Sequence, residues 1–140
     1  MSNGVKQLLA FDFGLKQIGV ASASRLIGSA SELAMIGAKE GQPQWPEIEK
    51  LIQEWKPDLC LVGLPLNMDG SESVLSQRAR KFANQIHGRF GTKIEMVDER
   101  LSSFEAKHQS AEQGHRGDYK KAPIDALAAK ILAEQWMRNN

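Results

Sequence analysis

The sequence predicts one α/β domain built on a mixed β-sheet. Gln7–Phe13 is apolar on both faces, as a central strand should be, and it is followed by a short turn at Gly14–Lys16 and a second extended segment at Gln17–Ala23. Such a pair predicts an antiparallel hairpin. Two later apolar strands, Leu59–Gly63 and Lys93–Val97, are separated by helical patterns, which favours parallel pairing through right-handed crossovers. The length of 140 residues suits a single domain, 1–140.

The remaining elements follow from apolar spacing and from turn residues. A weaker extended segment is expected around Gly28–Met35, followed by a polar loop over Gly37–Pro46. Apolar residues at helical spacing predict four helices: one from Pro46 to the residue before Pro57, one over Leu75–Phe90, one starting at the capping box Ser102–Glu105, and one after Pro123.

The composition limits the classes of function. Lysine and arginine number 18 and aspartate and glutamate 17, a net charge of +1, and Cys60 is the single cysteine, which excludes a disulfide framework and a cysteine-rich zinc site. Cys60 stands in an apolar run, so we expect a buried thiol. The sequence has no signal-peptide pattern after Met1 and no apolar run near the roughly 18 residues of a membrane span. We therefore expect a cytoplasmic protein.

The charge is unevenly distributed, with −2 over residues 1–70 and +3 over residues 71–140. The imbalance is strongest between Ser71 and Lys93. This segment has one acidic residue, Glu72, and five basic residues, namely Arg78, Arg80, Lys81, Arg89 and Lys93. The group predicts either a solvated helix face or a surface that binds a polyanion.

Three carboxylate positions require an explanation. Asp12 interrupts a strand that is buried on both faces, which is costly unless the carboxylate is hydrogen-bonded, paired or bound to a metal. The alternative is a cap on the Gly14 turn. Asp98 and Glu99 end a later strand and point to opposite faces, so at most one of them can share a site with Asp12. An ion pair with Arg100 or a solvated loop is the alternative for that pair.

Asp125 is the third position, in the first turn of the last helix, where the helix dipole alone favours an acid. It also shares a helix face with Ala128, Ala129 and Leu132, small or apolar residues that would let this face approach the sheet. The two explanations, a dipole effect and an inward-facing carboxylate, remain open at this point.

Together, Asp12, Glu99 and Asp125 would form an oxygen-rich site without His or Cys, the kind that suits Mg²⁺ or Mn²⁺. A pair of such ions beside basic residues indicates phosphodiester hydrolysis. Lys16 and Arg100 could hold phosphate oxygens, or could be solvated surface charges. The loop His115–Lys121, which contains Lys120 and Lys121 next to Tyr119, could grip a single strand or could simply be flexible.

The order and spacing of several motifs resemble a known family. The motifs are Asp12-Phe13-Gly14-Leu15-Lys16-Gln17-Ile18-Gly19-Val20-Ala21, Gly63-Leu64-Pro65, Asp98-Glu99-Arg100-Leu101-Ser102 and Ile124-Asp125-Ala126-Leu127-Ala128-Ala129. Over nearly the whole chain, the sequence resembles the YqgF (RuvX) family of Holliday-junction-resolvase-like proteins.

The resemblance implies an RNase H-like fold, a five-stranded mixed sheet flanked by helices, and a nuclease that matures the 5′ end of precursor 16S ribosomal RNA. Carried over by motif, Asp12, Glu99 and Asp125 would be the catalytic, metal-binding residues. Lys16, Arg78, Lys81, Arg100, Lys120 and Lys121 are then the expected nucleic-acid contacts. The expected partners are precursor 16S rRNA and pre-ribosomal particles, with branched DNA as the alternative, for a monomer or a homodimer.

The sequence departs from the family pattern at three places. Gln17 stands where many members have Arg, and Ser24-Arg25 where many have Asp. Related resolvases carry a glutamate at the end of the fourth strand, where this chain has Gly63-Leu64-Pro65, so Glu99 would have to act from the neighbouring strand.

Two other classes of function compete with the nuclease. One is an RNase H-like module that binds nucleic acid without cutting it. The other is a nucleotide phosphotransferase, because Asp12-x-Gly14-x-Lys16 after a first strand also resembles the phosphate loop of actin-like ATPases. Those enzymes bind nucleotide between two such domains, and 140 residues supply only one.

Overall fold

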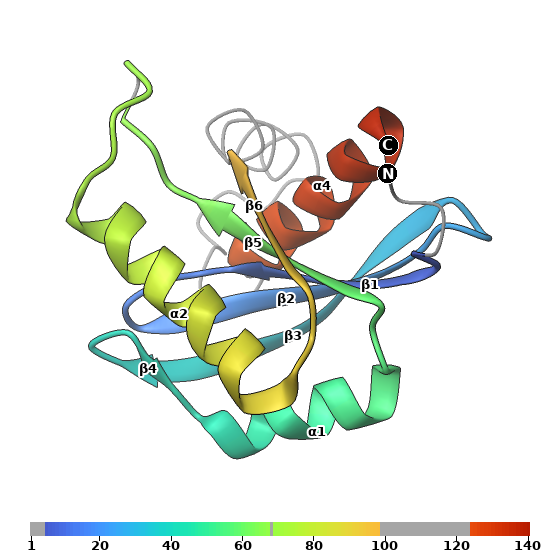
Figure 1. Ribbon diagram of the computed structural model, residues 1–140, viewed down its shortest axis with the longest axis horizontal. Coiled ribbons are helices and arrows are strands. Elements are labelled where there is room, and N and C mark those ends of the chain that lie inside the picture. The colour runs from blue at the N-terminus through green and yellow to red at the C-terminus, as the bar shows by residue number, and fades with distance from the viewer. Residues whose placement is uncertain (1–4, 68, 99–123) are drawn as a thin grey trace.

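The structure is a computed structural model that describes residues 5–67, 69–98 and 124–140. Its strands are β1 (Gln7–Asp12), β2 (Gln17–Ser24), β3 (Ser29–Lys39), β4 (Gln42–Pro43), β5 (Leu59–Leu64) and β6 (Ile94–Asp98), and its helices are α1 (Trp45–Trp55), α2 (Val74–Phe90) and α4 (Ile124–Asn139). The strands form one sheet in the order β4-β3-β2-β1-β5-β6 (Figure 1). β1 pairs antiparallel with β2 and parallel with β5, which is parallel to β6. The predicted mixed α/β fold is therefore confirmed.

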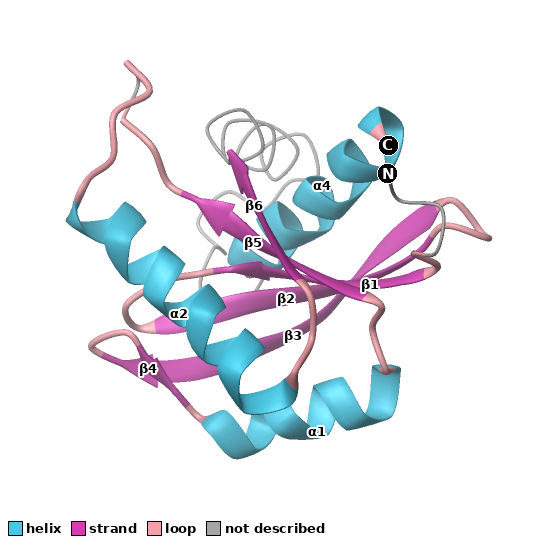
Figure 2. Cartoon of the chain, viewed as in Figure 1, coloured by secondary structure: helices cyan, strands magenta, loops and turns pink. Residues whose placement is uncertain are grey.

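Helices cover both faces of the sheet, and β1 supplies side chains to both layers (Figure 2). Leu9 and Phe11 pack on the face that carries α1 and α2, whereas Leu8 and Ala10 pack on the face that carries α4. All four are fully buried. This explains why β1 is apolar from Leu8 to Phe11, since both of its faces lie inside the protein there.

The first layer is organised around Phe82 of α2. Its ring lies 5.7 Å from that of Phe11, 5.3 Å from that of Phe13 and 5.9 Å from that of Trp45, measured between centroids. Aromatic rings at these separations interact favourably in addition to the area they bury. The packing holds α2 firmly against the end of β1.

The start of β1 is fixed by a carboxylate at the opposite end of the sheet from Asp12. Asp58 accepts hydrogen bonds from the backbone N–H groups of Gln7 (3.0 Å) and Lys6 (2.9 Å), and these bonds hold the pKa of its carboxyl below the ordinary value. Cys60 on β5 is fully buried, as expected, and burial raises the pKa of its thiol to about 12. A neutral buried thiol is neither a nucleophile nor a metal ligand at neutral pH.

The expected loop over Gly37–Pro46 is wrong in part. β3 is eleven residues long and extends to Lys39, and it turns back into the two-residue strand β4, which gives the sheet six strands instead of five. The turn consists of Glu40 and Gly41, both in the left-handed region with φ of 51° and 83°. Polar residues hide this hairpin from a search for apolar alternation, because β4 lies at the edge of the sheet.

Two expected elements lie outside the described residues, namely the helix that starts at Ser102–Glu105 and the loop His115–Lys121. The helices that are described contain no segment long and apolar enough to span a membrane. α1 begins at Trp45 with a proline in its first turn and ends at Trp55, followed by the left-handed residue Lys56, as the Pro46 and Pro57 positions predict.

Candidate active site

The carboxyl ends of the three parallel strands meet at one edge of the sheet, which we call the carboxyl edge. Phe11 of β1 is level with Val62 of β5, and Val62 with Met96 of β6. Asp12 ends β1 and Asp98 ends β6, so both acids lie at this edge. In Figure 1 the arrowheads of β1, β5 and β6 point to the same side. In open α/β sheets, ligands bind outside the carboxyl ends of strands.

Asp12 belongs to the face of the sheet that carries α4. Side chains alternate along a strand, so Asp12 follows Leu8 and Ala10, which pack toward α4. Phe13, the next residue, is buried in the layer under α2. The Asp12 residue is half-buried and makes polar interactions within the protein. It is therefore an acid held at the rim of the core.

Glycines flank Asp12 on both neighbouring strands. Gly19 of β2 is its register partner, and Gly63 of β5 is one residue beyond the last β1–β5 pair. Both glycines lie on the α4 face, because each is two residues from a side chain that packs there: Gly19 from Ala21, and Gly63 from Leu61. Since neither glycine has a Cβ, no side chain projects from these two cross-strand positions next to Asp12.

α4 brings its first turn toward the same edge. At its other end, Trp136 donates a hydrogen bond to Glu95 near the start of β6 (Nε1 to Oε2, 2.6 Å), so the C-terminus of α4 lies at the opposite edge. The 16 residues of α4 span about 24 Å, slightly more than the six residues of β1. Asp125, the second residue of α4, therefore lies at the level of the carboxyl edge. Ala128 and Ala129 are buried, as the small-residue face predicts.

The two adjacent acids at the end of β6 are separated by strand alternation. Ile94 and Met96 pack in the layer under α2, whereas Val97 packs in the α4 layer. Asp98 follows Ile94 and Met96, so it faces away from Asp12. Glu99 lies outside the described residues.

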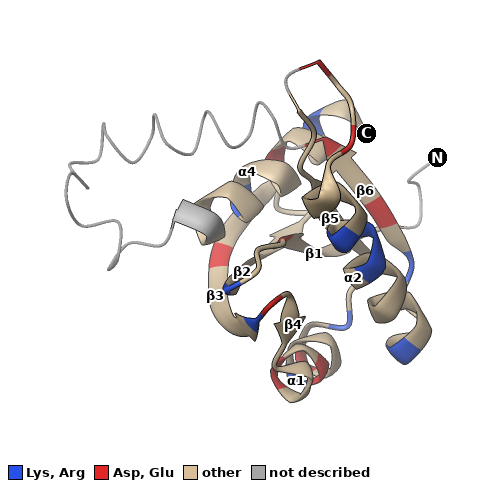
Figure 3. Ribbon diagram, turned by 90° about the vertical axis from the view of Figure 1, so that its left-hand side faces the viewer, with Lys and Arg blue, Asp and Glu red and all other residues tan. Residues whose placement is uncertain are grey.

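The predicted basic contacts divide between described and undescribed residues. Lys16 is exposed in the turn between β1 and β2, and Arg78 and Lys81 are exposed in the first half of α2. All three are at the carboxyl edge, but α2 covers the opposite face of the sheet from Asp12 (Figure 3). Arg100, Lys120 and Lys121 lie outside the described residues.

A serine pair that the sequence analysis missed fixes the start of α2. Ser73 and Ser76 form a reciprocal capping box, and the buried Ser76 hydroxyl also donates to the Pro65 carbonyl just after β5. The spacing Ser-x-x-Ser is a variant of the usual capping-box signal, in which Glu or Gln occupies the last position. These bonds tie the segment between β5 and α2 to the carboxyl edge.

The described residues do not complete a metal site. Among them no group of three or more His, Cys, Asp or Glu side chains is close enough to hold an ion. Of the three predicted ligands, Asp12 is described in full and Asp125 only in its helix position. The described part supplies Asp12, a hard oxygen donor flanked by two glycines, and such a donor fits a divalent cation of the Mg²⁺ class.

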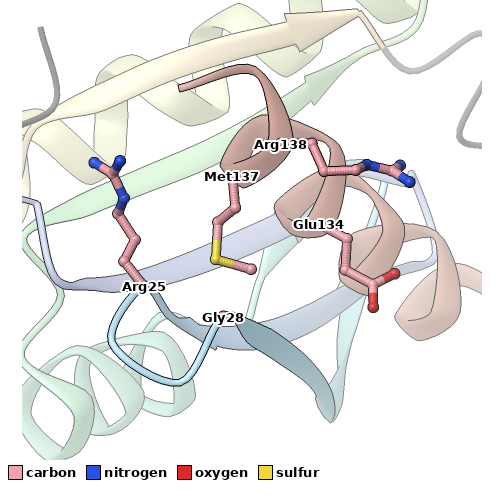
Figure 4. A pocket seen from close by; sticks show the side chains of 5 residues that line it. All are labelled: Arg25, Gly28, Glu134, Met137 and Arg138. Carbon is pink, nitrogen blue, oxygen red and sulfur yellow. The ribbon is translucent and has the colours of Figure 1, made fainter.

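A cavity of about 450 Å³ lies at the other edge of the sheet, between the β2–β3 turn and the end of α4 (Figure 4). The Arg25 guanidinium beside it donates to the Asn140 carbonyl (2.6 Å) and lies 5.5 Å from the centre of the Trp136 ring. These contacts hold the C-terminal end of α4. Because the lining residues lie at this end of α4 and at the end of β2, the cavity is separate from the carboxyl edge.

Comparison with known proteins decides the family. A family model described as RuvX, Holliday junction resolvase, matches residues 6–139. The chain belongs to this family. The resemblance that the sequence motifs predicted is thereby confirmed.

Relatives with about 50% identity align with this chain over almost the entire length of both proteins. One from Saccharophagus degradans is 52% identical over 133 residues, which cover 95% of this chain and 94% of the relative. One from Pectobacterium atrosepticum is 53% identical over 136 residues, with coverages of 97% and 96%. Both are named "Putative pre-16S rRNA nuclease".

Solved structures confirm the RNase H-like resolvase fold of this RuvX family member. T. thermophilus RuvC in complex with a Holliday junction substrate matches with a TM-score of 0.57 and 15% identity, covering 96% of each chain. Fowlpox virus resolvase in complex with Holliday junction DNA matches with a TM-score of 0.58 and 14% identity, covering 95% of this chain and 97% of that one. At these identities the likeness concerns the fold.

Proposed function

We propose that this protein is a metal-dependent nuclease that hydrolyses phosphodiester bonds in RNA and matures the 5′ end of precursor 16S rRNA in the cytoplasm. The observation that carries the proposal is the position of Asp12. It ends a central strand at the carboxyl edge, it is half-buried, and glycines flank it on both neighbouring strands. The names of the relatives support the nuclease class and the RNA substrate.

Asp12, Glu99 and Asp125 are the proposed ligands of Mg²⁺ or Mn²⁺, in a site for two ions. Three observations on described residues support this set: Asp12 lies on the α4 face, Asp125 lies in the first turn of α4, and Asp98 points to the other face. Because Asp98 points to the other face, we propose Glu99 in its place as the third ligand. Divalent ions, when bound, supply an activated water and neutralise charge on the phosphate oxygens.

The remaining side chains of the site position the substrate. Lys16 is in the turn that directly follows Asp12, where its ammonium group can contact phosphate oxygens near the cleaved bond. Arg100, Lys120 and Lys121 are proposed to contact the backbone farther along. Backbone contacts of this kind supply most of the affinity for a nucleic acid and make it sensitive to salt.

A four-way DNA junction is the second candidate substrate. The family description and the two complexes with Holliday junctions favour it, since those proteins have the same fold. Their sequence identity to this chain is 15% or less. The relatives named for RNA are about half identical and match nearly the whole chain, so we place RNA first.

A cleavage assay tests the proposed function. The protein is incubated with end-labelled, 5′-extended 16S precursor RNA or with a four-way DNA junction, in Mg²⁺, in Mn²⁺ or in excess EDTA. We expect cleavage of the RNA with either ion and none in EDTA. Cleavage of the junction alone would replace the RNA assignment by the DNA one. Salt-sensitive binding without cleavage of either substrate would indicate a binding module instead.

A further inference from the structure

A small basic pocket lies at the carboxyl edge on the face opposite to Asp12. It has a volume of about 240 Å³, between α2, the β3–β4 turn and the residue that follows β1. Its lining consists of Phe13, Glu40, Gly41, Gln42, Arg78, Lys81, Phe82 and Gln85. Pockets for drug-sized molecules begin at about 300 Å³, so this one suits a smaller group.

The charge of the pocket comes from α2. Arg78 and Lys81 are three residues apart and so lie on the same helix face. Neither forms an ion pair with a carboxylate among the described residues, whereas Arg80 on the same helix forms a salt bridge with Glu72. Glu40 is the one acid in the lining, so the two cations outnumber it. An anion in the pocket would neutralise the remaining positive charge of its lining.

The β3–β4 turn holds the Arg78 guanidinium in place at the pocket. Arg78 donates from Nη1 to the carbonyl of Glu40 (3.1 Å), a bond that uses one of its five N–H groups. Glu40 and Gly41 have positive φ, and a Cβ on Gly41 would lie 3.2 Å from the Phe13 ring and 3.5 Å from Arg78 Nη1. Glycine at this position therefore keeps the pocket open.

The floor of the pocket strengthens its electrostatic field. Phe13 and Phe82 are buried, with ring centroids 5.3 Å apart, and form an apolar base beneath the cations. A cleft with charges of one sign and apolar walls focuses the field and attracts counter-ions. Gln42 and Gln85 add amide groups that can donate hydrogen bonds to oxygen.

We propose that this pocket binds one backbone phosphate of the nucleic acid, separate from the phosphate that is cleaved. The inference rests on the proposed function. Phe13 lines the pocket and Asp12 precedes it, so the two sites are joined by one peptide unit and lie on opposite faces of the sheet. A strand bound at Asp12 would pass over the turn with the exposed Lys16 and place a neighbouring phosphate between Arg78 and Lys81.

Binding of the 5′-extended precursor RNA tests the pocket. Affinity is measured by fluorescence anisotropy between 50 and 200 mM salt in EDTA, with the RNA checked to be intact, for the native protein and for Arg78→Gln and Lys81→Gln. Loss of one phosphate contact reduces the slope of log K against log salt by about 0.7 and weakens binding about fivefold at 0.1 M salt. We expect both variants to show these changes.

Arg80→Gln is the matched control, because it removes the same charge from the same helix outside the pocket, where Arg80 is paired with Glu72 (2.7 Å). We expect its salt slope to stay at the native value. If Arg80→Gln lowers the slope as much as Arg78→Gln and Lys81→Gln do, or if neither pocket variant changes it, the pocket proposal is wrong. Cleavage by the native protein is measured in parallel. If the native protein does not cleave but the two pocket variants still lower the salt slope, the proposed nuclease activity is wrong and the phosphate-binding pocket stands.

Discussion

Replacement of Asp12 by asparagine is expected to lower the rate of RNA cleavage by about 10³-fold or more. The substitution keeps the size of the side chain but removes the charge that a divalent cation requires. Metal ions contribute several kcal/mol of transition-state stabilisation, and each 1.36 kcal/mol is a factor of ten in rate. Single-turnover cleavage of the end-labelled precursor measures the effect, because it reports the chemical step apart from product release.

Asp58→Asn is the control for Asp12→Asn. Asp58 lies at the other end of the sheet, where it accepts hydrogen bonds from two backbone N–H groups, and an asparagine oxygen can still accept them. We expect cleavage by this variant at close to the native rate. Circular dichroism establishes that Asp12→Asn is folded. A folded Asp12→Asn protein that cleaves at the native rate would remove Asp12 from the mechanism.

Glu99→Gln is expected to have an effect of similar size, at least about 10²-fold on single-turnover cleavage, whereas Asp98→Asn should leave the rate within about threefold of native. The reason is strand alternation. Asp98 follows Ile94 and Met96 toward α2, and Glu99 is the proposed ligand from the Asp12 side. The pair compares two adjacent acids at one strand end, so each variant is the control for the other.

The reverse result would be equally informative. A large loss with Asp98→Asn and a native rate with Glu99→Gln would assign the third carboxylate to the α2 side of the sheet. The bound nucleic-acid strand would then have to reach the metal ligands from the side of the sheet that carries the basic pocket. The proposed ligand set would be wrong at that position.

Much of the fold could be predicted because its strongest signals are local. The middle of β1 is apolar from Leu8 to Phe11 since both faces are covered, and α2 has a continuous apolar stripe with Phe82 at its centre. β4 could not be found in this way. It has two residues at the edge of the sheet, and it depends on the positive φ of Glu40 and Gly41 instead of on apolar alternation.

The site was predictable in its residue types and less so in its geometry. A carboxylate in a buried strand identified Asp12, and alternation predicted that Asp98 and Glu99 would point apart. Which of them faces Asp12 depends on where α4 packs, because apolar residues occur on both faces of β6. Gly19 gave no signal of its own, since its meaning comes from pairing with Asp12.

The basic residues of α2 show a similar limit. Charge counting places Arg78, Arg80 and Lys81 in one group. The structure separates them, because Arg80 forms its two hydrogen bonds with Glu72 (2.9 and 2.7 Å) whereas Arg78 and Lys81 line a pocket with the β3–β4 turn. That turn is the part of the sheet that the sequence pattern did not reveal.

The central claim is that the carboxyl edge around Asp12 holds a divalent cation, and titration with Mn²⁺ tests it most directly. Electron paramagnetic resonance measures free Mn²⁺ in the presence of the native protein, Asp12→Asn and Asp58→Asn, without nucleic acid. We predict that the native protein and Asp58→Asn bind Mn²⁺ alike and that Asp12→Asn binds it at least about tenfold more weakly. Equal binding by all three proteins would contradict the claim.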